Sequence, residues 1–252
     1  MDHRPAYHLR ILAALAFLAL FPSLGAAQDY TQYEVQYMTV RPEATQDLNE
    51  ALAEHNQEYH SGGAYHANVW FVANGPRTAQ LVWVMGPLTF AQQDGRPAAG
   101  GHDDDWAGNV VPLLEPQGNV SYWRRADDLS YLPNTDVHPL IRVRFYEIAG
   151  GQMFRWNAQM ALVKEVHEAK RHPYPESIYR PRFRMEDGTD VATVVAYDSW
   201  ADLDEGPPFG ADFVDVHGVA AWQNFLNEMN DVIVNSWDEY RQLLPELSGG
   251  ES

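Results

Sequence analysis

The chain has 252 residues and contains no cysteine. This absence excludes a disulfide bond, a thiolate nucleophile and a thiolate metal ligand. It also excludes a lipid anchor on an N-terminal cysteine. The fold must therefore be stable without a covalent cross-link.

Basic residues are also scarce. Lysine and arginine number 17 against 35 aspartates and glutamates, which gives a formal net charge of −18 at pH 7. Such a balance opposes binding to nucleic acid or to an anionic membrane surface, because both carry negative charge. Aromatic residues, in contrast, make up 12% of the chain. They favour a well-filled core or an aromatic-lined cavity.

The common catalytic motifs are missing too. The sequence contains no glycine-rich phosphate loop, no G-x-S-x-G, no H-E-x-x-H and no EF-hand loop. These motifs place phosphates, nucleophiles or metals in known geometries. Their absence leaves open whether the chain is an enzyme.

No apolar run reaches the roughly 20 residues of a membrane-spanning helix. Residues 11–20 are apolar, follow Arg4 and Arg10, and precede the small residues Gly25, Ala26 and Ala27. This pattern predicts a secretory signal, residues 1–27, cleaved after Ala27, with an uncleaved anchor as the alternative. Cleavage would leave 15 basic and 34 acidic residues, a formal charge of −19. We therefore expect a periplasmic or secreted protein.

Two segments of the chain share one order of predicted elements. In the first, residues 33–40 alternate apolar and polar side chains as a half-buried strand does, and Pro42 opens a helix that ends near Tyr59. Two β-rich runs then flank Asn74-Gly75, a hairpin signal. The predicted strands are 33–40, 67–72, 79–85 and 119–124, with helices at 42–59 and 104–111.

The second segment repeats this order, with strands at 141–148, 177–185 and 191–198 and a helix at 153–170. Its Asp187-Gly188 turn stands where Asn74-Gly75 stands in the first segment. The spacing of apolar residues then predicts one long helix from Trp222 to Leu244, which Pro245 stops. No strand is predicted after Pro245, so closure of a barrel stays open.

A repeated β-α-β-β-α-(β) unit predicts an α+β fold of two tandem ferredoxin-like repeats. We assign residues 28–125 to the first repeat, 126–139 to a connector, 140–246 to the second repeat and 247–252 to a tail. On the paired strand, helix and hairpin blocks, 34–85 and 142–197, the chain resembles the dimeric α/β-barrel superfamily in a tandem single-chain form. The resemblance implies a pseudo-dimeric α/β barrel. That superfamily includes cofactor-independent monooxygenases, haem-binding and haem-degrading enzymes and isomerases.

Arginines gather on two strands of the second repeat. Alternation places Arg142, Arg144 and Tyr146 on one face of strand 141–148, opposite Val143 and Phe145. If the apolar face packs under the helices, the arginines point into the barrel. Buried guanidinium groups need carboxylates or an anionic ligand, because leaving them unpaired costs several kcal/mol.

We therefore predict a pocket for a small molecule that carries a carboxylate or a phosphate. An internal salt-bridge network and arginines facing solvent are the alternatives. The predicted ligand-binding residues are Arg142, Arg144, Tyr146, Arg180, Arg182, Arg184, Trp70, Trp83 and Tyr197.

Histidines recur with one spacing in both repeats. His55 and His60 are matched 112 residues later by His167 and His172, each pair near the end of a predicted helix. A spacing of five residues suits one shared metal poorly, so no metal site is predicted. A plain interpretation is that the histidines satisfy the helix C-terminus. The alternative makes His55 and His167 inward-facing catalytic bases or haem ligands.

The run from His102 to Asp105 contains three acidic residues. It is explained as a helix start, in which Asp103 caps the helix and the other acids favour the positive end of its dipole. Calcium binding is the alternative.

The sequence thus favours an exported α/β-barrel protein that binds a small anionic organic molecule and needs no cofactor. One alternative is a cofactor-independent or haem-linked monooxygenase or isomerase, with a histidine as base. Another is a structural protein that docks a partner. We expect no nucleic-acid partner and, after signal cleavage, no membrane partner, and the oligomeric state is open.

Overall fold

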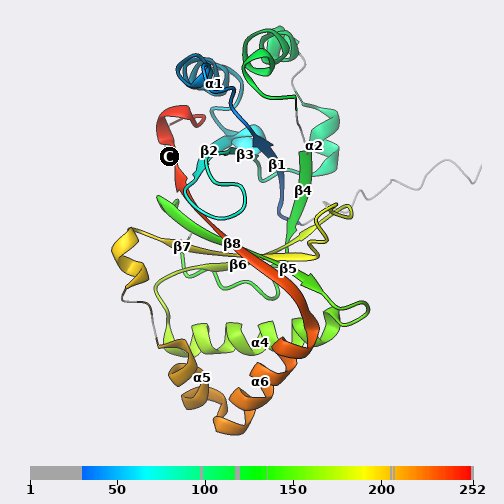
Figure 1. Cartoon of the computed structure of the whole chain (residues 1–252), viewed down its shortest axis with the longest axis vertical. Coiled ribbons are helices and arrows are strands. Elements are labelled where there is room, and N and C mark those ends of the chain that lie inside the picture. The colour runs from blue at the N-terminus through cyan, green and yellow to red at the C-terminus, as the bar shows by residue number, and fades with distance from the viewer. Residues whose placement is uncertain are drawn as a thin grey trace, which may run out of the picture.

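The computed structural model describes residues 30–96, 99–116, 120–134, 136–204, 206 and 208–250. The predicted signal peptide, residues 1–27, lies outside the described residues. Within them, a barrel of strands stands between two groups of helices (Figure 1). No helix in this part of the chain is apolar over enough residues to cross a membrane.

The first repeat contributes four strands and one long helix, β1 (Gln32–Met38), α1 (Thr45–Tyr59), β2 (Ala67–Val72), β3 (Leu81–Met85) and β4 (Val120–Arg125). Between β3 and β4 lie the short helices α2 (Phe90–Asp94) and α3 (His102–Asp105) and a π-helical turn, Trp106–Val110. Leu48 and Leu52 of α1 are fully buried in one cluster with Val69 and Trp83 of the sheet. Their spacing of four residues puts them on one helix face, which is why α1 covers the sheet.

The second repeat contains β5 (Leu140–Ile148), α4 (Met153–Lys170), β6 (Glu176–Pro181), β7 (Val191–Tyr197), α5 (Phe209–His217), α6 (Val219–Val232) and β8 (Ile233–Leu243). Trp156 of α4 and Phe213 of α5 are fully buried in the core of this helical layer. β6 ends at Pro181, earlier than predicted, because proline has no N–H to give to a sheet.

The eight strands close into a barrel in the order β1-β3-β2-β8-β5-β7-β6-β4. Neighbouring strands are antiparallel, and the two repeats join where β2 meets β8 and where β4 meets β6. Each repeat keeps its fourth strand beside its first, as ferredoxin-like units do. The predicted α+β class and the pseudo-dimeric barrel of tandem repeats are therefore confirmed.

The predicted C-terminal helix is wrong in its second half. α6 ends at Val232, and the chain continues as β8, which pairs with the whole of β5. β8 is the fourth strand of the second repeat, and it closes the barrel. Buried Glu239 and Arg241 concealed this strand, because charged residues on its inward face break the apolar alternation that marks a strand.

The inward-facing residues of β5 are apolar, which overturns the orientation predicted for its arginines. Val143 and Phe145 belong to the interior cluster. Arg142 and Arg144 therefore face the outer side of the sheet. Arg144 pairs there with Asp238 of β8 at 2.7 Å and keeps 38% of its side chain exposed. On this side the guanidinium group of Arg144 keeps part of its hydration, which a buried position would remove.

The arginines predicted on strand 177–185 are also outside the barrel. Arg180 donates a hydrogen bond to Asn157 of α4 at 2.8 Å. Arg182 and Arg184 follow the end of β6 and are exposed.

Candidate functional site

The barrel contains a cavity of about 550 Å³. Strand positions that alternate inward provide its wall, so the lining comes from both repeats. The wall contains aliphatic residues and six aromatic ones, namely Tyr33, Tyr37, Trp70, Trp123, Phe145 and Tyr179. A concave, largely apolar site of this size suits a small organic molecule.

A charged group lies beside this cavity. Arg241 lines the cavity and donates from Nε and Nη2 to Glu239, at 3.1 and 2.8 Å, and from Nη2 to the hydroxyl of Tyr37. Arg77 lies 2.6 Å from the other oxygen of Glu239, whose side chain is completely buried. Burial raises the pKa of Tyr37 to about 12. Two guanidinium groups thus share one buried carboxylate.

His138 lies among the lining residues of the segment that precedes β5. Its Nδ1 is 2.8 Å from Asp198, and its buried Nε2 has no hydrogen-bond partner among the described residues. Because a carboxylate only accepts hydrogen bonds, Nδ1 carries a proton, and in the neutral form of the ring Nε2 carries the lone pair. Of the described histidines, His138 alone lines this cavity.

The cavity matches the predicted ligand-binding residues only at Trp70. Trp83 faces α1 and donates to Asn56 at 3.0 Å. Tyr146 packs on Trp156 of α4, with ring centroids 5.9 Å apart.

Tyr197 likewise packs against Tyr174 and is absent from the cavity lining. The arginines that line the cavity are Arg125 and Arg241. The sequence interpretation missed Arg241 because it placed this residue on a helix. The signal was present in the inward positions of β8, where Trp237, Glu239, Arg241 and Leu243 stand two residues apart.

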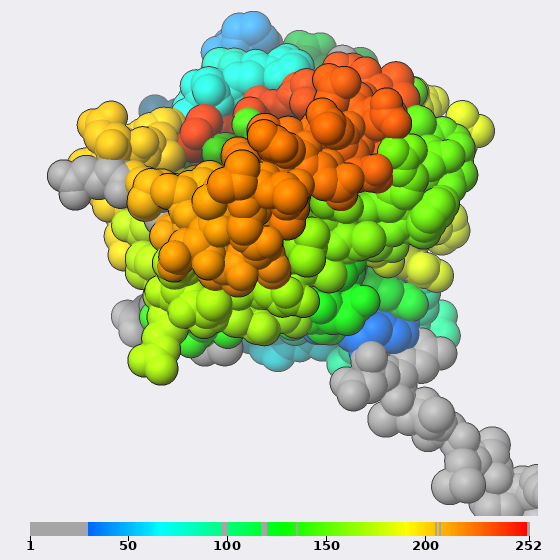
Figure 2. Space-filling view, turned by 90° about the horizontal axis from the view of Figure 1, so that it is seen from below, coloured from blue at the N-terminus to red at the C-terminus, as the bar shows by residue number. Residues whose placement is uncertain are grey.

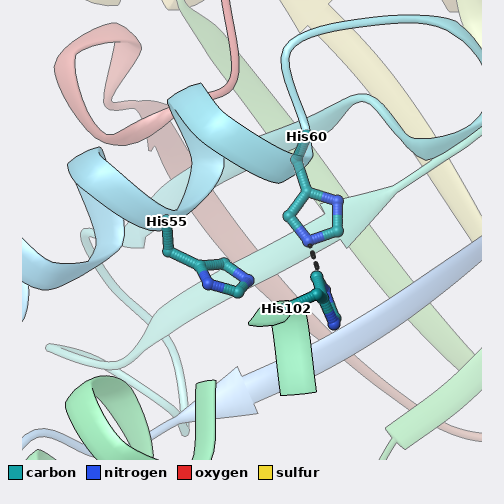
Figure 3. Close-up of side chains that lie close together, drawn as sticks. All are labelled: His55, His60 and His102. Atoms are coloured by element: carbon teal, nitrogen blue, oxygen red, sulfur yellow. Dashed lines mark hydrogen bonds between the residues drawn. The ribbon is translucent and has the colours of Figure 1, made fainter. Parts of the chain in front are cut away.

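Three histidines meet outside the barrel, between α1 and α3 (Figure 3). His55, His60 and His102 have exposed fractions of 1%, 0% and 2%. One ring nitrogen from each lies within 4.8 Å of those of the other two. Nε2 of His60 and Nε2 of His102 are 3.1 Å apart, and Nε2 of His55 is buried with no partner among the described residues. We call these residues the histidine trio.

The other ring nitrogen of each trio member meets an oxygen. Nδ1 of His55 is 2.7 Å from Asp105, Nδ1 of His60 is 2.8 Å from the Tyr65 carbonyl, and Nδ1 of His102 is 2.7 Å from Asp103. Burial lowers the pKa of His60 to about 3 and also lowers the pKa of His55. Both rings are therefore neutral near pH 7.

The geometry at the end of α1 explains how residues five apart converge. The helix ends at Tyr59, and His60 has a non-helical backbone with φ −129° and ψ 25°. The spacing argument against a shared site assumed an unbroken helix. The predicted cap at Asp103 is also wrong, because the N-cap of α3 is Gly101 and Asp103 holds His102 instead.

The second repeat has a matching pair but a different third partner. Nδ1 of His167 is 2.7 Å from Nδ1 of His172. Nε2 of His167 is 2.8 Å from Glu176, and Nε2 of His172 is 3.1 Å from Asp212. All four ring nitrogens are occupied by partners.

The predicted role of His55 and His167 as inward-facing bases or haem ligands does not fit this geometry. Neither residue lines the barrel cavity. Among the described histidines, the residue that fits a haem iron in the cavity is His138, because its Nδ1 is held by a carboxylate and its Nε2 has no partner.

Solved structures with similar folds were found. The chain superposes on a "putative monooxygenase" from Lactobacillus acidophilus NCFM with a TM-score of 0.57 and 10% identity, covering 84% of this chain and 94% of that one. For an anthrone oxidase-like protein the TM-score is 0.53 and the identity 12%, with 87% and 93% covered. For chlorite dismutase from Candidatus Nitrospira defluvii the TM-score is 0.53 and the identity 9%, covering 86% of this chain and 93% of that one. No protein-family model and no curated protein matches the sequence.

At these identities the likeness shows the fold alone. The chain has the dimeric α/β-barrel fold, in the tandem single-chain form that the sequence predicted. The function has to be argued from the cavity.

Proposed function

We propose that the barrel cavity binds a small aromatic molecule that carries an acidic group. One observation supports this proposal above the others: six aromatic residues and Arg241 line the same cavity of about 550 Å³. The proposal keeps the anionic organic ligand that the sequence favours but assigns it to other arginines.

The charges around Arg241 favour an anion. Arg241 and Arg77 share Glu239, and the further carboxylate near Arg77 is Asp187, 3.8 Å away at the surface. Such an exposed contact compensates little charge. Nη1 of Arg241 makes no hydrogen bond within the described part of the chain, so it can donate to a ligand carboxylate or sulfonate.

The first experiment compares two dyes that share an aromatic skeleton. Anilinonaphthalene sulfonate carries a negative charge, whereas phenylnaphthylamine lacks the sulfonate and is uncharged. Both fluoresce more strongly in an apolar site, so binding to the full chain is read directly. We expect the sulfonate to bind more tightly. Arg241→Gln should lower the affinity for the sulfonate by about tenfold or more and leave the affinity for the uncharged dye nearly unchanged. The reason is that a charge-assisted hydrogen bond contributes about 1.5 to 3 kcal/mol.

Two further variants separate the cavity from the rest of the surface. Arg144→Gln alters an arginine outside the cavity and should leave both affinities unchanged. Val194→Trp places a large ring in the cavity wall and should weaken both dyes. Equal affinity for the two dyes would contradict the anionic ligand. Binding that survives Val194→Trp would contradict the cavity and favour a structural role for the barrel.

A second candidate is cofactor-independent oxidation of an activated aromatic substrate, and His138 is the observation that favours it. Its Nε2 lone pair suits a general base, and Asp198 would stabilise the imidazolium that forms. One structural neighbour is anthrone oxidase-like, so anthrone is a reasonable probe. Nε2 would take a methylene proton, and the carbanion would pass electrons to O₂. One anthrone and one O₂ would give one anthraquinone and one water.

Oxygen uptake with anthrone tests this candidate. His138→Asn keeps a donor for Asp198 but loses the base, so the rate should fall by about 100-fold or more. His217→Asn on α5, away from the cavity, is the matched control. An unchanged rate in His138→Asn would rule out the base.

Haem-linked chemistry would need the same nitrogen, because an iron in the cavity would take Nε2 of His138. A haem would supply redox chemistry with O₂ or an oxyanion. A Soret band that forms on adding haem and is lost in His138→Asn would support it. A band of equal strength in the variant would exclude His138 as the ligand.

We also propose that the chain is exported and cleaved after Ala27, on the sequence pattern alone. Mass spectrometry of the protein recovered from exporting cells tests this point. A mature chain that begins at Gln28 is expected, and retention of Met1 would exclude cleavage.

A further inference from the structure

We propose that the histidine trio, His55, His60 and His102, binds one divalent transition-metal ion of the zinc type. Their three Nε2 atoms face a common point between α1 and α3 (Figure 3). The trio is separate from the barrel cavity, since none of its members lines that cavity. The inference therefore goes beyond the proposed function.

The proton positions in the trio follow from its outer partners. A backbone carbonyl and two carboxylates can only accept hydrogen bonds, so each Nδ1 must carry the ring proton. A neutral imidazole has one proton, so in the neutral form of the trio each Nε2 presents a lone pair. The 3.1 Å contact between Nε2 of His60 and Nε2 of His102 then brings two lone pairs together. A cation at the centre of the trio removes this conflict.

The same arrangement is common around bound metals. A metal-ligating histidine usually donates its second ring N–H to a carboxylate or a backbone carbonyl, which fixes its tautomer and orientation. All three trio members have such a partner, at 2.7 to 2.8 Å. Zinc–nitrogen bonds of about 2.0 to 2.1 Å in a tetrahedral site separate the nitrogens by about 3.3 Å. The 3.1 Å separation found between two of them is close to that value.

The second repeat supplies an internal comparison. His172 matches His60 in the sequence, and each has Nε2 3.1 Å from its third partner. That partner is the carboxylate of Asp212 in the second repeat and the imidazole of His102 in the first. In the second repeat Glu176 and Asp212 accept from both Nε2 atoms, so a further proton between the two Nδ1 atoms is needed to close the hydrogen-bonded chain. At the position of Asp212 the first repeat has an imidazole, a ligand that suits a transition-metal ion of the zinc type.

The donor set defines the class of ion. Three imidazoles suit zinc, copper, nickel, cobalt or iron, and disfavour calcium and magnesium, which prefer oxygen. Burial of all three rings favours an ion that holds the structure together. The ion would tie the end of α1 to α3, because His55 lies on α1, His60 caps it and His102 begins α3.

The test uses the full chain, stripped with a chelator and then titrated with Zn²⁺ or Co²⁺ alone. We expect one ion per chain, visible absorption bands of four- or five-coordinate Co²⁺, and a higher melting temperature with Zn²⁺. His102→Asn should lower the affinity by about 100-fold or more, because the amide can still donate to His60 but does not replace an imidazole ligand. His172→Asn, the matched change in the second repeat, should leave the affinity unchanged.

A second pair of variants tests the outer partners. Asp103 touches the trio only through Nδ1 of His102, so Asp103→Asn should weaken binding by about tenfold. Its exposed neighbour Asp104 is the control, and Asp104→Asn should have no effect.

Two results would overturn the proposal. One is a titration in which the unmodified full chain binds Zn²⁺ and Co²⁺ no more tightly than the His102→Asn variant does. The other is a melting temperature that is the same with Zn²⁺ and with chelator, which would mean that a proton shared between His60 and His102 suffices.

Discussion

Buried charge concentrates at Glu239. This carboxylate has no exposed surface and lies between Arg77 and Arg241. Both arginines also stack on the ring of Tyr37, with guanidinium carbons 4.1 and 5.3 Å from its centroid. Glu239 thus holds Arg241 in the cavity wall. Without this carboxylate, the guanidinium groups of Arg77 and Arg241 would face each other with no negative charge between them.

We predict that Glu239→Ala lowers the free energy of unfolding by about 3 to 5 kcal/mol, the usual cost of breaking a buried ion pair. Urea unfolding followed by tryptophan fluorescence measures it. Glu246→Ala removes an exposed carboxylate just after the same strand and should cost less than about 0.5 kcal/mol. A loss below about 1 kcal/mol in Glu239→Ala would mean that cavity water replaces the carboxylate.

Tyr37 makes stability depend on alkaline pH. Its pKa rises from 10.0 to about 12 because the hydroxyl is buried. The raised pKa of Tyr37 stabilises the folded state. This contribution is fully present at pH values below about 10, the pKa of the unfolded chain, and is lost as the pH rises through about 12. Its upper bound is about 3 kcal/mol.

Tyr37→Phe should therefore lose less stability than the parent chain between about pH 9 and pH 11.5. Unfolding free energies at several pH values measure the slope. Phe145→Leu, which alters the cavity wall without removing a hydroxyl, should keep the parent slope. A parallel slope in Tyr37→Phe would show that Tyr37 is hydrated in solution.

At the scale of single elements, the sequence was most informative where one side of an element is apolar. The prediction for α4 gave both ends of the helix, Met153 and Lys170. The prediction for β2, residues 67–72, was equally close. These segments alternate or repeat cleanly, and their neighbours in the sequence include strong turn residues.

The sequence was misleading for two strands. One has charged residues on its inward face, and the other has apolar residues on both faces. β8 buries the charged residues Glu239 and Arg241. Its remaining apolar and aromatic residues are spaced as in a helix, and so the segment was predicted to be helical. β5 is apolar toward the cavity at Val143 and also packs Tyr146 on α4. Local periodicity does not say which face is interior, and so the arginines were assigned to the wrong side.

The histidine trio was beyond local reasoning for a different reason. His60 becomes available only because α1 ends one residue earlier, and His102 arrives from a segment 42 residues away. No spacing within one element carries that information. The run of acids after His102 was a visible signal, since two of them hold trio members.

The register of β5 against β8 gives a test at this scale. Arg144 stands directly opposite Asp238, with both side chains partly exposed. Arg144→Asp and Asp238→Arg should each lower stability by about 0.5 to 1 kcal/mol, because like charges then face each other. The double exchange should restore most of the loss. If the double variant is as unstable as the sum of the two, this register or this pairing is wrong.

At the scale of the molecule, the two repeats share one order of strands but differ in their helices and in one histidine contact. Both repeats keep the four-strand order and the histidine pair at the end of the first helix, but the third partner differs. The view from below in Figure 2 shows α5 and α6, in orange, as a layer that covers one side of the second repeat. The first repeat has short helical turns at the corresponding place between its third and fourth strands.

The chain end links the two repeats. After β8 the segment 244–250 turns back and packs against the first repeat. Leu247 is buried in the cluster under α1, and its carbonyl accepts a hydrogen bond from Asn56 at 2.6 Å. The side chain of Ser248 accepts from the backbone N–H of Val69 at 3.0 Å. The second repeat thus supplies part of the first repeat's core.

We therefore predict that deleting residues 247–252 loosens the first repeat, although the deleted residues follow the second. Loss of the buried Leu247 side chain lowers the stability of the first repeat by about 2 to 3 kcal/mol, and the lost hydrogen bond of Asn56 lowers it further. Hydrogen exchange should accelerate in α1 and β2 and stay slow in α4. Equal acceleration in α4 would mean that the two repeats unfold as one unit.

A single substitution makes the same point without removing residues. A Cβ at Gly249 would lie 1.8 Å from the carbonyl oxygen of His60, so Gly249→Ala must push the chain end away from α1. We expect it to destabilise the protein by about 1 to 3 kcal/mol and to weaken metal binding at the trio, because His60 moves. Gly108→Ala, where a Cβ meets nothing within 4 Å, is the control. If Gly249→Ala lowers stability but leaves the metal affinity intact, the trio is held by α1 and α3 alone, and the chain end stabilises the first repeat without shaping its site.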